Sequence, residues 1–171
     1  MSNMQEKHIA NTEKAARFLS VLPHCKLLGM TIEFVDDQIL VMRLPYSPII
    51  VGNPLTGTVH GGSLTTLMDT ACGTGVFTFL PGHELCPTLD LRVDYMKAAT
   101  PGLDLFAVAK VTRISSSVVF TRCDVIQGKT YAEAVANAES EGSTGDLVAT
   151  CAAAFMRIGQ AMGTAKSGDT K

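Results

Sequence analysis

Hydrophobic positions along the chain recur with two different periods, and the first half of the sequence contains both. Over residues 5–22 apolar side chains recur at spacings of three and four, which predicts a helix that ends at Pro23. Two β runs follow over 25–46, joined by a turn at Asp36-Asp37. The stretch 46–60 is rich in Gly, Pro, Asn and Thr, which predicts a long connecting loop.

The second half of the chain is organised around one further helix. Residues 61–80 predict a central helix that stops before Pro81-Gly82. Three β segments are expected after it, at 87–97, at 103–125 with a break near 115–117, and at 146–158. The stretch 128–145 between the last two fits either a short helix or an exposed excursion. One helix set against a run of antiparallel strands is an α+β architecture.

Length and composition indicate one globular domain. The 171 residues are 46% hydrophobic and 18% charged, which is enough apolar material for a core and hints at an oligomer. We expect an N-terminal helical segment over 1–22, a domain over 23–160 and a disordered tail over 161–171.

Charge and cysteine content narrow the functional classes. The net charge of −2 comes without a Lys/Arg cluster, so we expect no nucleic-acid partner. The five cysteines include no C-x-x-C pair, so neither a disulfide framework nor a zinc site is expected. The polar N-terminus is unlike a signal peptide, and no apolar run reaches the roughly 18 residues of a membrane helix. A cytoplasmic protein without membrane attachment is therefore expected.

Chemistry is concentrated at the central helix. His60-Gly61-Gly62 stands at its start, where unpaired N–H donors and a partial positive charge favour an anion or a developing oxyanion. Glycines there let a carbonyl approach the backbone closely. Two turns later Asp69 places one carboxylate among apolar and small residues. Each feature also has a plain structural explanation: a solvent-facing Asp69, a loop histidine, a glycine turn, and an Asx turn at Asn53.

The combination of these residues resembles the signature of the hotdog-fold thioesterases of the phenylacetate-degradation type. His60-Gly61-Gly62 followed by Asp69, with Asn53 upstream, carries the resemblance. It extends to LLGMTIEFVDD, to PTLDLRVDYMKAATPG, a strand that typically ends in Tyr in this family, and to DLVATCAAAFM. It covers about residues 23–158, apart from 128–145, which is longer than the usual turn.

The resemblance implies a hotdog fold, in which an antiparallel sheet wraps one central helix, and an acyl-CoA thioesterase without metal or cofactor. Coenzyme A would enter as part of the substrate. Asp69 would be the general base or the nucleophile, and the Gly61 N–H the oxyanion donor. His60 and Asn53 would orient carbonyl and water, and Thr88 would hold the attacking water. Gly62 and Thr66 would contact the substrate at the start of the helix.

Two subunits of this family pair edge to edge, so a homodimer, and from it a homotetramer, is expected. Helix geometry gives an independent reason. Gly61 and Asp69 are eight residues apart, which is roughly 12 Å along a helix. One carbonyl cannot lie within about 3 Å of both, so the two groups that act on one substrate should come from different chains.

Two other functions fit the same residues. A hydratase or dehydratase of the same fold would use His60 and Asp69 for proton transfer at carbon, and a non-catalytic protein would bind acyl-CoA without cleaving it. The phosphates of coenzyme A require basic partners, for which Lys97, Arg113 and Arg122 are candidates by position.

Overall fold

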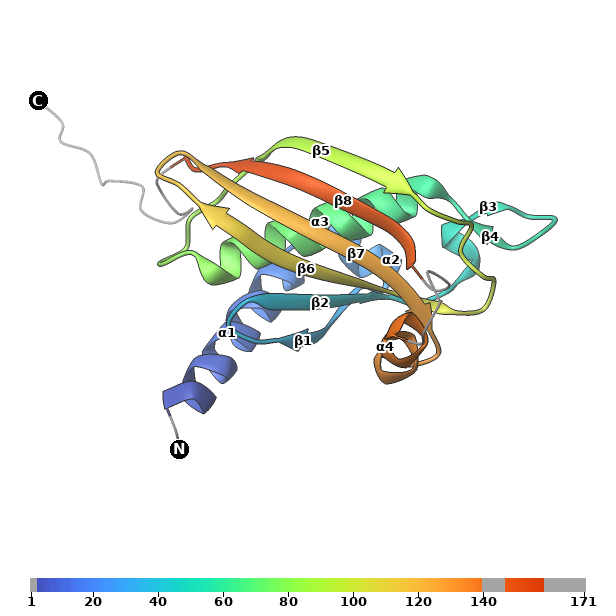
Figure 1. The fold of residues 1–171 in the computed structure, drawn as a ribbon, viewed down its shortest axis with the longest axis horizontal. Coiled ribbons are helices and arrows are strands. Elements are labelled where there is room, and N and C mark those ends of the chain that lie inside the picture. The colour runs from blue at the N-terminus through green and yellow to red at the C-terminus, as the bar shows by residue number, and fades with distance from the viewer. Residues whose placement is uncertain (1–2, 140–146, 159–171) are drawn as a thin grey trace, which may run out of the picture.

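One antiparallel sheet and the helix it wraps make up the body of the protein. The computed structural model describes residues 3–139 and 147–158, so the expected tail at 161–171 lies outside the described residues. The six strands are ordered β1 (Thr31–Val35), β2 (Ile39–Leu44), β6 (Asp104–Ile114), β7 (Val118–Gly128), β8 (Leu147–Met156) and β5 (Thr88–Tyr95). Helix α3 (Gly61–Phe79) runs across one face of this sheet (Figure 1). This is the expected hotdog arrangement.

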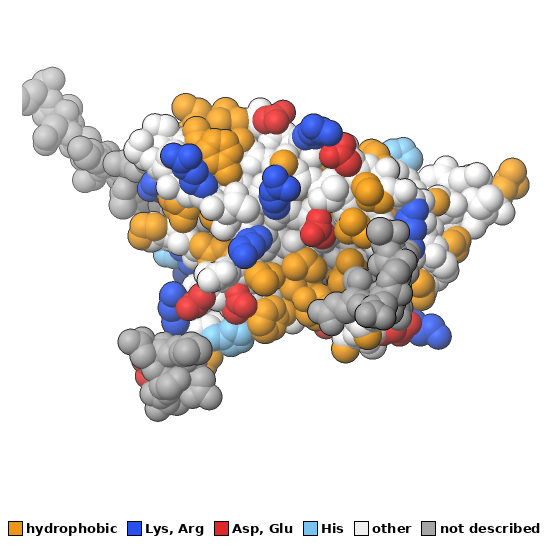
Figure 2. All heavy atoms as spheres, viewed as in Figure 1, with side chains coloured by type: hydrophobic (Ala, Val, Ile, Leu, Met, Phe, Trp, Pro, Cys, Tyr) orange, Lys and Arg blue, Asp and Glu red, His pale blue; other side chains and the backbone are white. Residues whose placement is uncertain are grey.

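Alternation along the strands explains why the sheet closes on the helix. In β7, Thr121, Cys123 and Val125 are buried, whereas the residues between them are exposed. The buried residues join the side chains of α3 in one core, with Leu67, Met68 and Cys72 fully enclosed. On the opposite face of the sheet, side chains of both charges are scattered between apolar ones (Figure 2). The helix therefore supplies the centre of the core.

The region before the sheet differs from the prediction of two β runs from residue 25. Residues 23–28 form a short helix, α2 (Pro23–Leu28), and Pro23 begins this helix instead of ending the previous one, α1 (Asn3–Ser20). Proline suits a first helical position because that residue needs no N–H partner, and Gly29, at φ 69°, ends the helix. The predicted turn is confirmed, since the Asp36 carboxylate accepts hydrogen bonds from two backbone N–H groups of the β1–β2 connection.

The stretch 46–60 is more ordered than a plain loop. It contains a 3₁₀ turn, η1 (Pro48–Ile50), and a small hairpin of β3 (Val51–Asn53) and β4 (Thr58–Val59). The hairpin leads directly into α3.

Of the two alternatives for 128–145, the short helix is found at α4 (Tyr131–Glu139). It packs on the outer face of the sheet, where Ala134 meets Val41, Phe106 and Ile126 in a second, smaller apolar cluster. This cluster explains why β2 alternates imperfectly, because Val41 is buried on the face that is elsewhere open to solvent.

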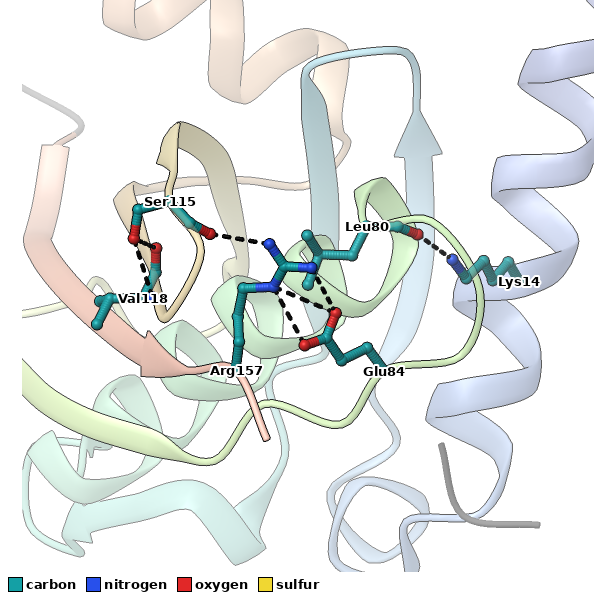
Figure 3. Close-up of polar contacts among 6 residues, drawn as sticks. All are labelled: Lys14, Leu80, Glu84, Ser115, Val118 and Arg157. Atoms are coloured by element: carbon teal, nitrogen blue, oxygen red, sulfur yellow. Dashed lines mark hydrogen bonds and ion pairs between the residues drawn. The ribbon is translucent and has the colours of Figure 1, made fainter. Parts of the chain in front are cut away.

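Helix α1 is fastened to the end of α3. Lys14 Nζ donates a hydrogen bond to the Leu80 carbonyl at 2.6 Å (Figure 3). It donates another to the Thr78 carbonyl at 3.2 Å and lies 5.2 Å from the centre of the Phe77 ring. A cation there complements the partial negative charge of a helix C-terminus. Burial lowers the pKa of Lys14.

No helix in the described part of the chain is long and apolar enough to cross a membrane.

The Lys14→Met variant is expected to lower the free energy of unfolding by about 1–2 kcal/mol, because two helix-end carbonyls lose a charged donor. Lys7→Met is the matched control on the same helix. Lys7 pairs with Asp37 on an exposed surface, so its loss should change stability by less than about 0.5 kcal/mol. Urea unfolding of both variants measures the difference, and equal effects would contradict the anchoring role of Lys14.

Candidate active site at the central helix

The start of α3 presents a backbone donor. His60 is the N-cap, and its Nδ1 accepts a hydrogen bond from the Gly62 N–H at 2.9 Å. The Ser63 N–H bonds to the His60 carbonyl. Among the residues that the structure describes, the Gly61 N–H has no acceptor. The capped turn therefore leaves Gly61 as the donor available to a ligand, while Gly62 is held by His60.

Tyr95, at the end of β5, fixes this turn. Its hydroxyl donates to the Gly61 carbonyl at 3.0 Å and shares a hydrogen bond with the Thr65 hydroxyl at 2.7 Å. A Cβ on residue 61 would lie 3.3 Å from the Tyr95 hydroxyl, which is a tight contact. The close approach of Tyr95 therefore favours glycine at this position. Sequence reasoning did not assign Tyr95 to the site. The sequence did contain a signal for Tyr95, because this strand typically ends in tyrosine in the family that the chain resembles.

Asp69 and Thr88 are brought together by α3 and β5. The Thr88 hydroxyl donates to Asp69 Oδ1 at 2.9 Å, and Asp69 is half-buried. No other hydrogen bond to this carboxylate occurs within the described ranges, so Oδ2 is open to water or substrate. Asp69 and Thr88 both line two neighbouring hollows in the surface.

The two hollows differ in character. The first, of about 370 Å³, extends from Asp69 and Thr88 over mainly apolar side chains that include Phe77 and Phe155. The second, of about 550 Å³, is lined by more threonine side chains, with Thr65 and Thr66 beside the same pair. The predicted residue Thr66 therefore lines the same hollow as Asp69, and its hydroxyl donates to the Gly62 carbonyl at 2.9 Å.

Asn53 lies apart from these groups in the exposed β3–β4 hairpin. Its side-chain oxygen accepts the Leu55 N–H at 3.0 Å, which is the Asx-turn arrangement. In the same hairpin, a Cβ on Gly52 would come within 2.8 Å of the His60 Cα, so glycine permits the close approach that seats His60 at the helix start. The roles predicted for Asn53 and His60 toward a substrate stay predictions.

The three candidate phosphate partners do not form one group facing the hollows. Arg122 alternates with Thr121 and Cys123, which face the core, so it points to the outer face of the sheet. Arg113 is exposed, and Lys97 is half-buried after the end of β5. Their contact with coenzyme A stays a prediction.

Four of the five cysteines are core residues. The sulfur atoms of Cys72, Cys123 and Cys151 lie within 4.8 Å of one another, and they are the side chains within the described ranges that could together hold a metal ion. They come from α3, β7 and β8, and they fill the centre of the core as small hydrophobic residues do. Hydrogen bonds to the other two thiols, together with burial, raise the pKa of Cys123. Cys86 differs, because it is half-buried and lines the apolar hollow.

Iodoacetamide is expected to modify Cys86 first in the folded protein, with the four buried thiols reacting only on unfolding. Burial, with the nearby Glu84 charge, raises the pKa of Cys86, so the reactive thiolate forms only at higher pH. Labelling should therefore be slower at pH 7 than that of an exposed thiol and should accelerate toward alkaline pH. Mass spectrometry of the peptides identifies the site, and rapid labelling of Cys72 or Cys123 would contradict the packing described.

A six-stranded antiparallel sheet wrapped around one long central helix defines the class as a hotdog-fold protein. Sequence comparison gives the family: the thioesterase superfamily matches residues 56–134. A crystal structure of a Pseudomonas aeruginosa protein is 44% identical, with a TM-score of 0.71 over 86% of this chain and 99% of that one. The chain belongs to the thioesterase superfamily, which confirms the expected enzyme class.

Two further proteins are similar to this chain, one in sequence and one in fold. The medium/long-chain acyl-CoA thioesterase YigI of Escherichia coli is 26% identical over 121 residues, which is 63% of this chain and 77% of YigI. The Escherichia coli PaaI protein from the phenylacetic acid degradation operon shares the fold, with a TM-score of 0.72 at 18% identity, over 90% of this chain and 97% of that one.

Proposed function

We propose that the protein hydrolyses acyl-CoA thioesters, with Asp69 as the group that delivers or activates the attacking oxygen. The observation that carries the proposal is the Asp69–Thr88 pair, which lines both a hollow with phenylalanine side chains and a hollow with additional threonine hydroxyls. A thioester carbonyl beside this pair would have its acyl group in the first hollow and its thiol arm in the second. The acyl-CoA activity named for YigI supports the choice of substrate.

The Thr88 hydroxyl prepares Asp69 for either of two steps. By donating to Oδ1 it holds the carboxylate in place and leaves Oδ2 directed at the substrate. As a general base, Oδ2 would take a proton from water that attacks the carbonyl. As a nucleophile, it would form an acyl–aspartyl anhydride that water then cleaves. Both routes give the free acid and the coenzyme A thiol, and both use water without a metal or cofactor.

An oxyanion forms on the carbonyl oxygen in either route, and Gly61 is the proposed donor. The N–H of Gly61 stands at the positive end of α3, and the Tyr95 hydroxyl holds the neighbouring peptide through its bond to the Gly61 carbonyl. Because Asp69 of the same chain is roughly 12 Å away along α3, we propose that Gly61 of one subunit acts with Asp69 of its partner.

Strand β5 offers an edge for such pairing. It ends the sheet and bonds only to β8 in the described structure. On this strand Leu89 is 55% exposed and Tyr95 is 53% exposed. Met96, which follows the strand, is 57% exposed. An open edge with large exposed apolar side chains fits a self-complementary interface about a two-fold axis. We propose a homodimer through β5, from which a homotetramer could form, in the reducing cytoplasm where free cysteines persist.

Thiol release from a panel of acyl-CoA thioesters tests the proposal. We expect at least one thioester to release thiol with a kcat in the ordinary enzymatic range of about 1–1,000 per second. Hydration of an enoyl-CoA without thiol release would instead assign the site to a hydratase. Tight acyl-CoA binding with neither reaction would identify a binding protein.

A further inference from the structure

The apolar hollow beside Asp69 is a pocket whose polar groups lie on the side that it shares with the second hollow. Asp69, Thr70 and Thr88 line both. The remaining wall is mostly apolar: Phe18, Leu22, Phe77, Leu85, Phe155 and Ile158. A hydrocarbon can fill such a space, because Asp69 is the one charged side chain among the described residues that line it.

The length of this pocket can be measured along one face of α3. Asp69, Gly73 and Phe77 follow one another at intervals of four residues, so they lie on the same face of the helix, and all three line the pocket. Asp69 and Phe77 are therefore roughly 12 Å apart along the axis. Three bonds of an extended chain span about 3.8 Å, so 12 Å corresponds to about nine bonds.

Gly73 keeps the middle of the pocket open. Gly73 has no side chain. Any other residue at this position would project its side chain into the space between Asp69 and Phe77. A Cβ there would lie 3.5 Å from the Phe155 ring, which is ordinary contact, so a larger side chain would have to occupy the pocket itself.

Two segments outside α3 form the remaining walls of the pocket, and side-chain contacts hold each of them in place. From α1, Phe18 stacks on Phe77 with ring centres 4.6 Å apart, and Lys14 ties the same helix to the end of α3. The segment that carries Leu85 and Cys86 is held from the other side. There the Arg157 guanidinium donates to both carboxylate oxygens of Glu84 and to the Ser115 carbonyl (Figure 3). These contacts fix the distance between the walls.

We propose that this pocket selects straight, saturated acyl chains of about eight to ten carbons, and that Gly73 is the residue that sets the accepted length. The proposal rests on the proposed thioesterase function and specifies its substrate class. Each further methylene buried should raise kcat/KM about fourfold until the chain reaches Phe77. Beyond that length kcat/KM should level off or fall.

The test is a chain-length series from butyryl-CoA to palmitoyl-CoA with wild type and Gly73→Leu. Wild type should be best with octanoyl- or decanoyl-CoA. The variant should lose about 50-fold or more with decanoyl-CoA, equivalent to three buried methylenes at about fourfold each, and keep butyryl-CoA hydrolysis within about threefold. Gly75→Ala is the control on the same helix, since Gly75 is buried against Leu40 away from the pocket and has room for a methyl group. It should leave the length profile unchanged.

Protection of Cys86 gives a second readout that needs no turnover. Decanoyl-CoA bound to the Asp69→Asn protein should slow iodoacetamide labelling of Cys86 at least about fivefold, whereas acetyl-CoA should not, because only the longer chain reaches this wall.

The outcomes separate the two proposals. Hydrolysis with an equal loss for all chain lengths in folded Gly73→Leu, or equal Cys86 protection by both probes, overturns the length-selecting pocket and leaves the thioesterase function standing. If no acyl-CoA is hydrolysed, the function fails, and the labelling experiment still decides whether the pocket takes a medium-length chain.

Discussion

The Asp69→Asn variant is expected to lower kcat by about 100-fold or more on the best acyl-CoA substrate, the scale of a lost general base. Asparagine keeps the size of the side chain, and its carbonyl oxygen can still accept the Thr88 hydrogen bond. It lacks the negative charge and the basicity that both proposed routes require. Initial rates of thiol release at saturating substrate measure the effect.

Asp37→Asn is the control for this experiment. Asp37 lies in the exposed β1–β2 turn and pairs with Lys7 on the surface, far in sequence from the site. It should retain activity within about twofold, because exposed ion pairs contribute little. An Asp69→Asn protein that stays folded and retains more than about a third of the wild-type rate would remove Asp69 from the chemistry.

Two inactive variants are expected to restore activity to each other when their subunits are mixed. Gly61→Val should be inactive because its side chain would meet the Tyr95 hydroxyl and displace the donor N–H. In a mixed dimer with Asp69→Asn, one site would combine an intact Gly61 with an intact Asp69 from the other chain. The second site would carry both defects. Random exchange of subunits in a two-fold dimer should therefore recover about a quarter of the wild-type activity.

Unfolding and refolding of an equal mixture, followed by the thiol-release assay, measures this recovery. Each variant treated alone is the control and should stay inactive. No recovery in a mixture that is shown by native mass spectrometry to contain the mixed dimer would mean that both groups act within one chain. That result would contradict the shared site even if the thioesterase activity is confirmed.

The parts of the fold that sequence predicted well are those in which one local pattern decides the structure. The central helix was placed within one residue at its C-terminal end, because Gly61-Gly62 and Pro81 mark its limits. The Asp36-Asp37 turn and the break near residues 115–117 were also found, since turn residues there interrupt strongly apolar runs.

The parts that sequence missed depend on contacts between distant segments. The apolar residues of α2 resemble the start of a strand, although Pro23 and Gly29 mark the limits of the short helix, which packs against the core through Cys25 and Leu28. The resemblance implied that Thr88 would hold the attacking water, and its hydrogen bond to Asp69 depends on how β5 lies against α3. The contribution of α1 to the pocket, like the bond from Tyr95 to Gly61, has no signal in residue spacing at all.

The origin of the pocket walls bears on how such a protein can diverge. Phe18 and Leu22 come from α1 and the segment that follows it, outside the part of the chain that matches the thioesterase superfamily, residues 56–134. Asp69, Gly61 and Thr88 all lie inside it. Substitutions in the N-terminal helix can therefore change part of the proposed acyl pocket without altering the proposed reacting groups, whereas changes at Gly73 or Phe77 fall within the matched segment.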